Sequence, residues 1–448
     1  MNVSQWLQSL ESFTGAFYKK CPDVEFRGIL CYLIHRLKEG QVLELGVLRS
    51  LIKTAGGYSF ADYSPTASLS ASQLAGRGGS KLLKQQTFAF GVVEKVSMRA
   101  SKRVRSVLQN DNIGVTLLIL LAQLRNRLVF NSRDKRKHVK LIGNLYDSCQ
   151  VVMSMLLEFI TDSSDEEEGG ATNESAISRY RQSLPPLSEL HSDYGLEPCM
   201  AWMLWRPLHH EERNGEHDNG ESQDGVISQM APEAAFSVIS PTVFEVFYGR
   251  ALYDLHFPEG SYAGEIARLK RDEERLFLKK KLNPIDFTRG DDADLDRTRF
   301  IIKSLSHDME TQEKHCESVR STLAAKKSQF FPSGQVSVEA VRALLTHCIF
   351  PRCMLSPEDA MYCVHFTHTL HQLETPGFSI LHYFDELVQL SGGALYCTTE
   401  SESAALGILL LECWKIISRW RYDEKAFADE VANKVSFPCP CVVNPRGF

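Results

Sequence analysis

The chain has 448 residues, 43% of them apolar and 24% charged, and a net charge of −6 at pH 7. This length allows two or three domains, and about three quarters of the unfolded surface can become buried on compaction. The composition is that of an ordinary soluble protein, and the charge excludes a general attraction to nucleic acid or to an anionic membrane.

No membrane-spanning or exported segment is expected. The longest apolar runs, residues 115–122 and 404–411, are shorter than the ~20 residues that a bilayer requires, so they predict buried core helices. The N-terminus has no basic region ahead of an apolar one, which argues against a secretory signal.

Cysteine usage indicates a reducing compartment. The sequence holds twelve cysteines, and Cys31, Cys149, Cys363 and Cys413 lie within predicted apolar helix faces. A cysteine in such a position acts as a small hydrophobic residue. We therefore expect the cytosol or the nucleus.

The first sixty residues read as helices. Apolar spacing of three and four predicts an amphipathic helix near the N-terminus, followed by helices over residues 26–37 and 42–52. Residues 58–90 are rich in Ser, Ala and Gly, which predicts a long surface excursion. Strict alternation of apolar and polar residues is scarce throughout, so strands are not expected.

Stronger helices follow over residues 99–110, 113–129 and 138–160. The last of them carries Leu141, Leu145, Cys149, Val152, Leu156 and Phe159 on one side. Residues 162–170 and 209–225 are acidic and nearly free of apolar side chains, and such segments cannot offset their ordering entropy. Both are predicted to be disordered loops.

A second helical block begins at Ser240 and Pro241, which predict a capped helix start. Residues 261–282 and 292–330 are two highly charged helical stretches joined by a turn rich in Pro and Gly. This arrangement predicts a long antiparallel helical hairpin projecting from the body.

The clearest helix start is at Pro357. Ser356 is suited to accept from the unpaired amides of the first turn, Pro357 needs no amide hydrogen there, and Glu358 and Asp359 favour the positive end of the helix dipole. The apolar face of this helix continues until residues 375–377, and a second helix is predicted over 378–390. Thr399 and Glu402 then form a T-x-x-E capping box that opens another helix.

These elements predict an all-α, solenoid-like helical repeat array with a protruding helical hairpin and disordered acidic loops. The predicted divisions are a helical block over residues 1–208, an acidic linker over 209–229, a second helical block over 230–434 with the hairpin at about 261–330, and an irregular tail over 435–448.

One group of residues suggests metal chemistry. Cys353, His365 and His368 combine Cys and His near one helix, which allows the hypothesis of a zinc-dependent hydrolase. The spacing is not a standard finger arrangement, and no Glu stands beside these residues as a general base would. A structural or solvent-facing helix is favoured, and no catalytic residue and no cofactor is expected.

Two basic clusters could contact phosphates or serve as a nuclear import signal, although a solvated surface is the simpler interpretation. Neither has the interleaved aromatic residues of a base-stacking surface. The first cluster consists of Arg99, Lys102, Arg103 and Arg105, and the second of Arg133, Lys135, Arg136, Lys137 and Lys140.

Several unusual stretches stand in the order found in one known family. They are EFRGILCYLIHRLKEGQ, LLILLAQLRNRLVF, HVKLIGNLYDSC, ISPTVFEVFYGRALYDLHFPEGSYAGEIARLK and CIFPRC, followed by HQ-x-x-TP-x-FS. The chain resembles THO complex subunit 2, and it corresponds to the middle region and the start of the C-terminal domain of that longer family.

The resemblance implies a non-catalytic nuclear scaffold of the THO part of the transcription-export complex, acting in messenger RNP assembly and in mRNA export. The implied partners are the other THO subunits, a DEAD-box RNA helicase and the messenger RNP, with no membrane involved. Two alternatives remain: a generic helical-repeat adaptor in trafficking, and the zinc-dependent hydrolase.

Overall fold

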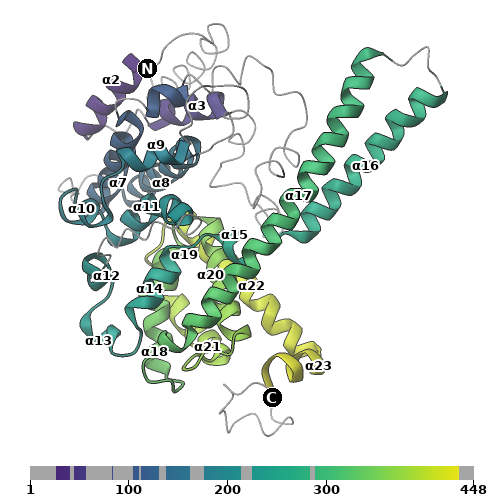
Figure 1. Cartoon of the computed structure of the whole chain (residues 1–448). Coiled ribbons are helices and arrows are strands. Elements are labelled where there is room, and N and C mark those ends of the chain that lie inside the picture. Colours follow the sequence, from purple (N-terminus) through teal and green to yellow (C-terminus); the bar gives the residue numbers. More distant parts are fainter. Residues whose placement is uncertain are drawn as a thin grey trace.

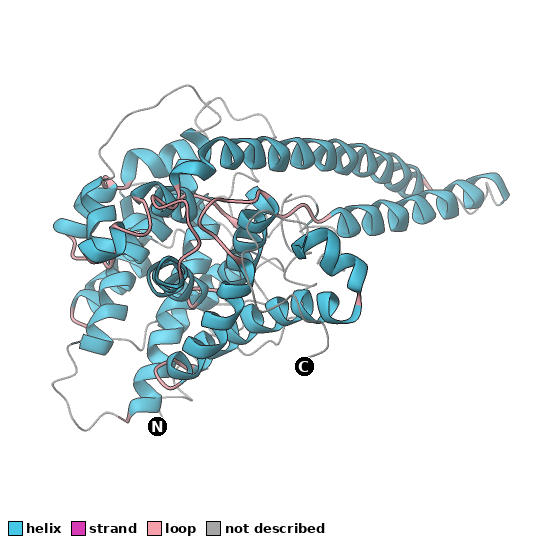
Figure 2. Cartoon of the chain, turned by 90° about the horizontal axis from the view of Figure 1, so that it is seen from below, coloured by secondary structure: helices cyan, strands magenta, loops and turns pink. Residues whose placement is uncertain are grey.

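The computed structural model describes residues 27–40, 45–56, 83, 104–109, 112–130, 138–161, 176–212, 224–282 and 288–432. Within these residues every regular element is a helix and there is no strand (Figure 2). The all-α prediction is therefore confirmed, whereas the solenoid arrangement stays a prediction. The amphipathic helix near the N-terminus, residues 58–90 apart from Leu83, the acidic loop at 162–170 and the tail at 435–448 lie outside the described residues.

The N-terminal half is organised around two long helices that pack against each other. These are α7 (Ile113–Phe130) and α8 (Val139–Thr161), with α2 (Arg27–Lys38) against α7 and α3 (Leu45–Gly56) against α8. By length and composition alone, α7 is the one described helix able to cross a membrane. Most of its residues are buried inside the fold, as predicted for a core helix.

Shorter helices cover this pair and lead into the second half: α9 (Ala176–Ser183), α10 (Leu187–Ser192), α11 (Pro198–Glu212), α12 (Asp224–Met230) and α13 (Glu233–Phe236). The predicted linker over residues 209–229 is shorter than expected, because α11 continues to Glu212 and α12 starts at Asp224. Residues 213–223 lie outside the described part of the chain.

The C-terminal half is a second helical layer below the first (Figure 1). Its body contains α14 (Pro241–Tyr248), α15 (Leu252–Leu255), α18 (Val338–Leu344), α19 (Phe350–Cys353), α20 (Pro357–Gln372), α21 (Ile380–Leu395), α22 (Glu400–Tyr422) and α23 (Glu424–Phe427). Short π-helical turns follow α18 and α23. The predicted starts at Pro357 and after Thr399 are confirmed.

The predicted hairpin is confirmed as α16 (Glu259–Leu282) and α17 (Arg289–Lys326), which project far beyond the body (Figure 1). Ion pairs join the two helices near the tip, among them Lys279 with Asp291 at 2.8 Å and Arg299 with Glu273 at 2.7 Å. A small separate core lies nearer the base of the hairpin and contains Leu83, Tyr262, Ile266, Leu269 and Leu305.

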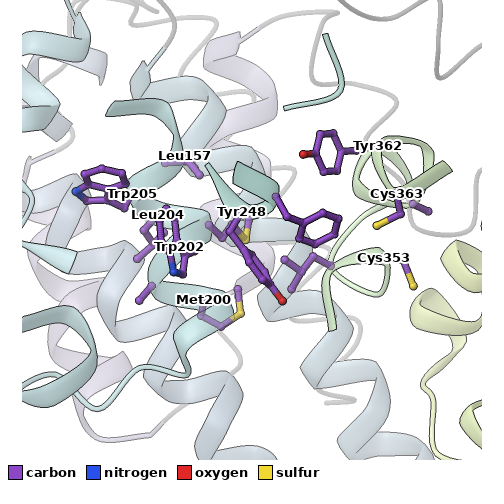
Figure 3. Packing of buried hydrophobic residues seen from close by; sticks show 14 of the residues in the cluster. Leu157, Met200, Trp202, Leu204, Trp205, Tyr248, Cys353, Tyr362 and Cys363 are labelled. Carbon is purple, nitrogen blue, oxygen red and sulfur yellow. The ribbon is translucent and has the colours of Figure 1, made fainter. Parts of the chain in front are cut away.

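One hydrophobic core runs through both halves of the molecule. Trp202 on α11 is fully buried beside Trp205 and Tyr248, and the same cluster contains Cys353 and Cys363 of the C-terminal half (Figure 3). Polar contacts join the halves as well, since Asp147 on α8 accepts from the Thr399 hydroxyl at 2.5 Å. The division into two blocks stays a prediction, and the two halves share one core.

Three predicted core positions differ from the structure. Cys31 is exposed because α2 buries Leu30, Leu33 and Leu37 on another face, and Leu141 is exposed at the first turns of α8. The apolar run at 404–411 is only half buried: Ala405, Leu406 and Leu409 face the core, whereas Leu411 is 51% exposed. Apolar character marks a helix face, but the neighbouring elements decide how much of it becomes covered.

Two serines at helix starts make a matched test of capping. The Ser337 hydroxyl accepts from the Ala340 amide at 3.2 Å and so caps α18. Ser240 directly precedes Pro241 but does not cap α14, contrary to the prediction. Its buried Oγ has no hydrogen-bond partner among the described residues. We expect Ser337→Ala to lower the free energy of unfolding by about 1 kcal/mol. Ser240→Ala should leave it nearly unchanged. Urea unfolding of both variants measures the difference, and equal losses would contradict it.

Candidate functional site

The most elaborate polar arrangement in the described residues surrounds Arg352, on the short helix α19. Its side chain is 0% exposed. Nε donates to Asp359 Oδ1 at 2.8 Å, Nη2 donates to the carbonyl of Arg250 at 2.5 Å, and Nη1 donates to the carbonyl of Phe247. One guanidinium thus joins α19 to the start of α20 and to the end of α14.

The start of α20 holds Asp359 in place. The Asp359 amide donates to the Ser356 hydroxyl at 3.0 Å, and that hydroxyl donates to Asp359 Oδ2 at 2.9 Å. Arg206 of α11 adds a third contact, donating from Nη1 to Asp359 Oδ1 at 2.8 Å. Burial alone would raise the pKa of the Asp359 carboxyl, but the guanidinium groups of Arg206 and Arg352 hold it below its usual value.

Aromatic rings close the arrangement. The Arg352 guanidinium lies 3.5 Å from the centroid of the Tyr362 ring and 5.1 Å from that of Phe247. A cation between two ring faces is stabilised by their quadrupoles and is shielded from water. We call Arg206, Arg352, Asp359 and Tyr362 the arginine junction. Because it is buried, its role is to hold four helices together rather than to meet a substrate.

The thiols near this junction are not activated as nucleophiles or metal ligands. Burial raises the pKa of the Cys348, Cys353 and Cys363 thiols well above their usual value, so these groups stay protonated. The Cys353 thiol donates to the carbonyl of Phe350 at 3.4 Å. Among the described residues, no three His, Cys, Asp or Glu side chains are grouped to hold a metal ion. The structure does not bring Cys353, His365 and His368 together as a zinc site.

His365 packs instead against another imidazole. Its ring centroid lies 4.4 Å from that of His256, and His368 lies one turn further along α20. Burial, with smaller effects from His256 and His368, lowers the pKa of His365 to about 3. This ring is therefore neutral at physiological pH.

The neutral His365 makes folding sensitive to acid. The unfolded chain binds a proton near pH 6.5 whereas the folded chain does so only near pH 3, so stability is lost as the pH falls through that interval. We expect His365→Gln to remove this part of the pH dependence, which amounts to at most about 1.4 kcal/mol per pH unit. Urea unfolding between pH 7.5 and 5 measures it. His307→Gln, at an exposed histidine, is the control, and its free energy of unfolding should depend on pH as that of the wild type does. The same pH dependence in His365→Gln would refute the prediction.

The structure describes only two residues of the predicted basic clusters. Arg105 is 6% exposed, and its Nε donates to the carbonyl of Phe159 at 3.0 Å while the guanidinium lies over that ring. It therefore fastens its helix to α8 and does not face solvent. Lys140 is exposed in the first turn of α8. The cluster members outside the described residues are Arg99, Lys102, Arg103, Arg133, Lys135, Arg136 and Lys137.

From the sequence, no role is predicted for Arg352 within CIFPRC, and Asp359 is predicted only to favour the positive end of the helix dipole. The available signal was an arginine enclosed by apolar residues directly before an N-cap. Its acceptors at Phe247 and Arg250, and the second arginine that pairs with Asp359, Arg206, lie more than 100 positions away, and no local pattern identifies them.

The described residues thus form an all-helical fold in which the buried arginine junction and one core join two layers. A family profile described as "Transcription factor/nuclear export subunit protein 2" matches residues 236–441. Proteins named THO complex subunit 2 match almost the whole chain: 29% identity over 98% of it for Arabidopsis thaliana, 26% over 97% for Homo sapiens and 20% over 97% for Saccharomyces cerevisiae. The chain belongs to the THO complex subunit 2 family. It spans about a quarter of the length of these curated relatives.

Proposed function

We propose that this chain is a non-catalytic scaffold within a THO complex, acting in messenger RNP assembly and nuclear mRNA export coupled to transcription. Its proposed partners are other THO subunits, a DEAD-box RNA helicase and the messenger RNP. Its proposed location is the nucleus.

The observation that carries the proposal is the extent of the match. It covers 98% of the chain against a relative named as a subunit of the THO complex, and the CIFPRC stretch places Arg352 at the buried junction between the layers. A rigid helical body with a projecting hairpin offers extended surfaces for several partners at once. A scaffold of this kind needs no reacting group.

Affinity purification from nuclease-treated nuclear extract tests the proposal. The tagged chain should recover other THO subunits and the helicase, identified by mass spectrometry. Trp202→Ala, which removes the largest fully buried side chain among the described residues, is the matched control and should lose these proteins because the surfaces depend on the folded core. Recovery of trafficking proteins instead of THO subunits would favour the alternative adaptor function.

Direct RNA contact is a narrower part of the proposal. Since Arg105 is buried, the second cluster around exposed Lys140 is the better candidate for phosphate contacts. We expect charge reversal of Arg133, Lys135, Arg136, Lys137 and Lys140 to reduce ultraviolet crosslinking to RNA while the protein partners are retained. Reversal of Lys279, Lys280 and Lys281 at the hairpin tip, where Lys279 and Lys280 already pair with aspartates, is the control. Equal losses in both variants would argue against a specific RNA surface.

A further inference from the structure

Among the residues that the structure describes, none covers the outward face of α22. The helix buries Ala405, Leu406, Leu409, Cys413 and Trp420 toward the body. On its opposite side, Leu411 is 51% exposed and Trp414 is 57% exposed. Burial of such large apolar side chains is the usual source of association free energy.

The exposed positions follow the spacing of a helix-packing seam. Ala404, Gly407, Leu411 and Trp414 are all exposed and are spaced by three and four residues. Exposed Arg421 lies seven residues beyond Trp414 on the same side, with half-buried Ser418 between them. This period keeps one stripe facing a second helix along its whole length. The stripe is therefore shaped for another helix rather than for an irregular peptide.

Gly407 indicates a close approach from outside the chain. A glycine inside a helix is less stable than alanine by about 1 kcal/mol. A Cβ atom added to Gly407 would meet nothing within 4 Å, so no contact with the described part of the chain requires the small residue. A bulky side chain from a partner would require it.

The stripe carries such a side chain itself. If a second α22 lies antiparallel, Trp414 of one copy can pack over Gly407 of the other, and each contact occurs twice about the twofold axis. In the same register, Glu400 of one copy faces Arg421 of the other. The reason is that the Gly407–Trp414 pair and the Glu400–Arg421 pair have the same midpoint along α22, between residues 410 and 411. The two Leu411 side chains then meet near the axis. Size and charge complementarity thus agree on one arrangement.

We propose that the outward face of α22 is the interface of a homodimer, in which two copies of this chain pack antiparallel through Gly407, Leu411 and Trp414. The acidic start and the basic end of α22 set the direction of packing. A parallel pair would place Glu400 against Glu400 and Arg421 against Arg421.

Sedimentation equilibrium of the purified full chain at about 10 μM provides the first test. We expect a mass twice the 50.6 kDa of one chain. Gly407→Leu, which fills the space for the indole, and Leu411→Glu, which places like charges at the axis, should each weaken dimerisation about a hundredfold or more. Val388→Glu makes a comparable change at a 65% exposed position on α21 and should leave the dimer intact.

Circular dichroism must show unchanged helicity in all three variants, so that loss of the dimer is not loss of folding. A wild-type chain that stays monomeric up to 100 μM, on the order of the weakest specific associations, would overturn the proposal. So would a dimer that survives both Gly407→Leu and Leu411→Glu.

Disulfide trapping tests the register. In the double variant Glu400→Cys with Arg421→Cys, the two new thiols of one chain are about 32 Å apart along the helix and cannot pair with each other. We expect an intermolecular disulfide between positions 400 and 421, identified by peptide mass spectrometry. Glu400→Cys alone should not form a symmetric 400–400 disulfide; its formation would indicate parallel packing and would refute the proposed arrangement.

Discussion

Replacing Arg352 with alanine is expected to lower the free energy of unfolding by about 3–5 kcal/mol, because the change removes one member of a buried ion pair. The carbonyls of Phe247 and Arg250 lose their donors, and Asp359 keeps only Arg206 as an ion-pair partner. A space next to the Tyr362 ring is left empty as well. Since native domains have only about 5–15 kcal/mol of net stability, this variant should be close to unfolding at 37 °C.

Arg299→Ala is the matched control for this prediction. Arg299 also pairs with one carboxylate, that of Glu273, at 2.7 Å through Nε. Both side chains of this pair are partly exposed, at 49% and 30%, so water can replace the lost contacts. Chemical unfolding of the two variants should give a much smaller loss for Arg299→Ala than for Arg352→Ala. Similar losses at both positions would show that burial of the arginine junction is not the source of its effect.

Trp202→Ala is expected to lower the free energy of unfolding by a comparable amount, about 3–5 kcal/mol, through loss of apolar burial and creation of a cavity. The Trp202 ring centroid lies 5.6 Å from that of Trp205 and 6.3 Å from that of Tyr248 (Figure 3). Because the core is continuous between the layers, the loss should reach both of them.

Amide hydrogen exchange with mass spectrometry measures where the loss occurs. Protection should fall in α8 and in α20 together, although these helices belong to different layers. Tyr396→Ala, at a side chain that is 93% exposed, is the control and should leave exchange unchanged in both helices. If Trp202→Ala changed protection in α8 alone, the two layers would be independent folding units.

The helix starts were predictable because their determinants are local. The Ser356 hydroxyl accepts from the Asp359 amide, and the Thr399 hydroxyl accepts from the Glu402 amide at 3.3 Å. The Glu402 carboxylate in turn accepts from the Thr399 amide at 2.9 Å. Both motifs require only four consecutive residues. The hairpin was predictable for the same reason, since two charged helical stretches flank one short turn.

The candidate site was much less predictable. The sequence neighbours of Arg105 predict a basic surface, but the helix that carries it turns the side chain toward Phe159. The CIFPRC motif predicts no role for Arg352, because its partners come from α14 and α20, and Arg206 of α11 joins the junction through Asp359. Charge and spacing describe what a side chain can do, whereas burial depends on elements far away in the sequence.

The sequence by itself determined the helices, the caps at Ser356 and Thr399, the hairpin and the family, because each depends on short patterns or on ordered words along the chain. Only the tertiary structure decided that one core joins the two layers, that Arg352 is enclosed by aromatic rings, and that the described neighbours leave one face of α22 open. The physical reason is that covering a helix face requires neighbours, and the packing of distant helices selects which apolar residues lose their contact with water.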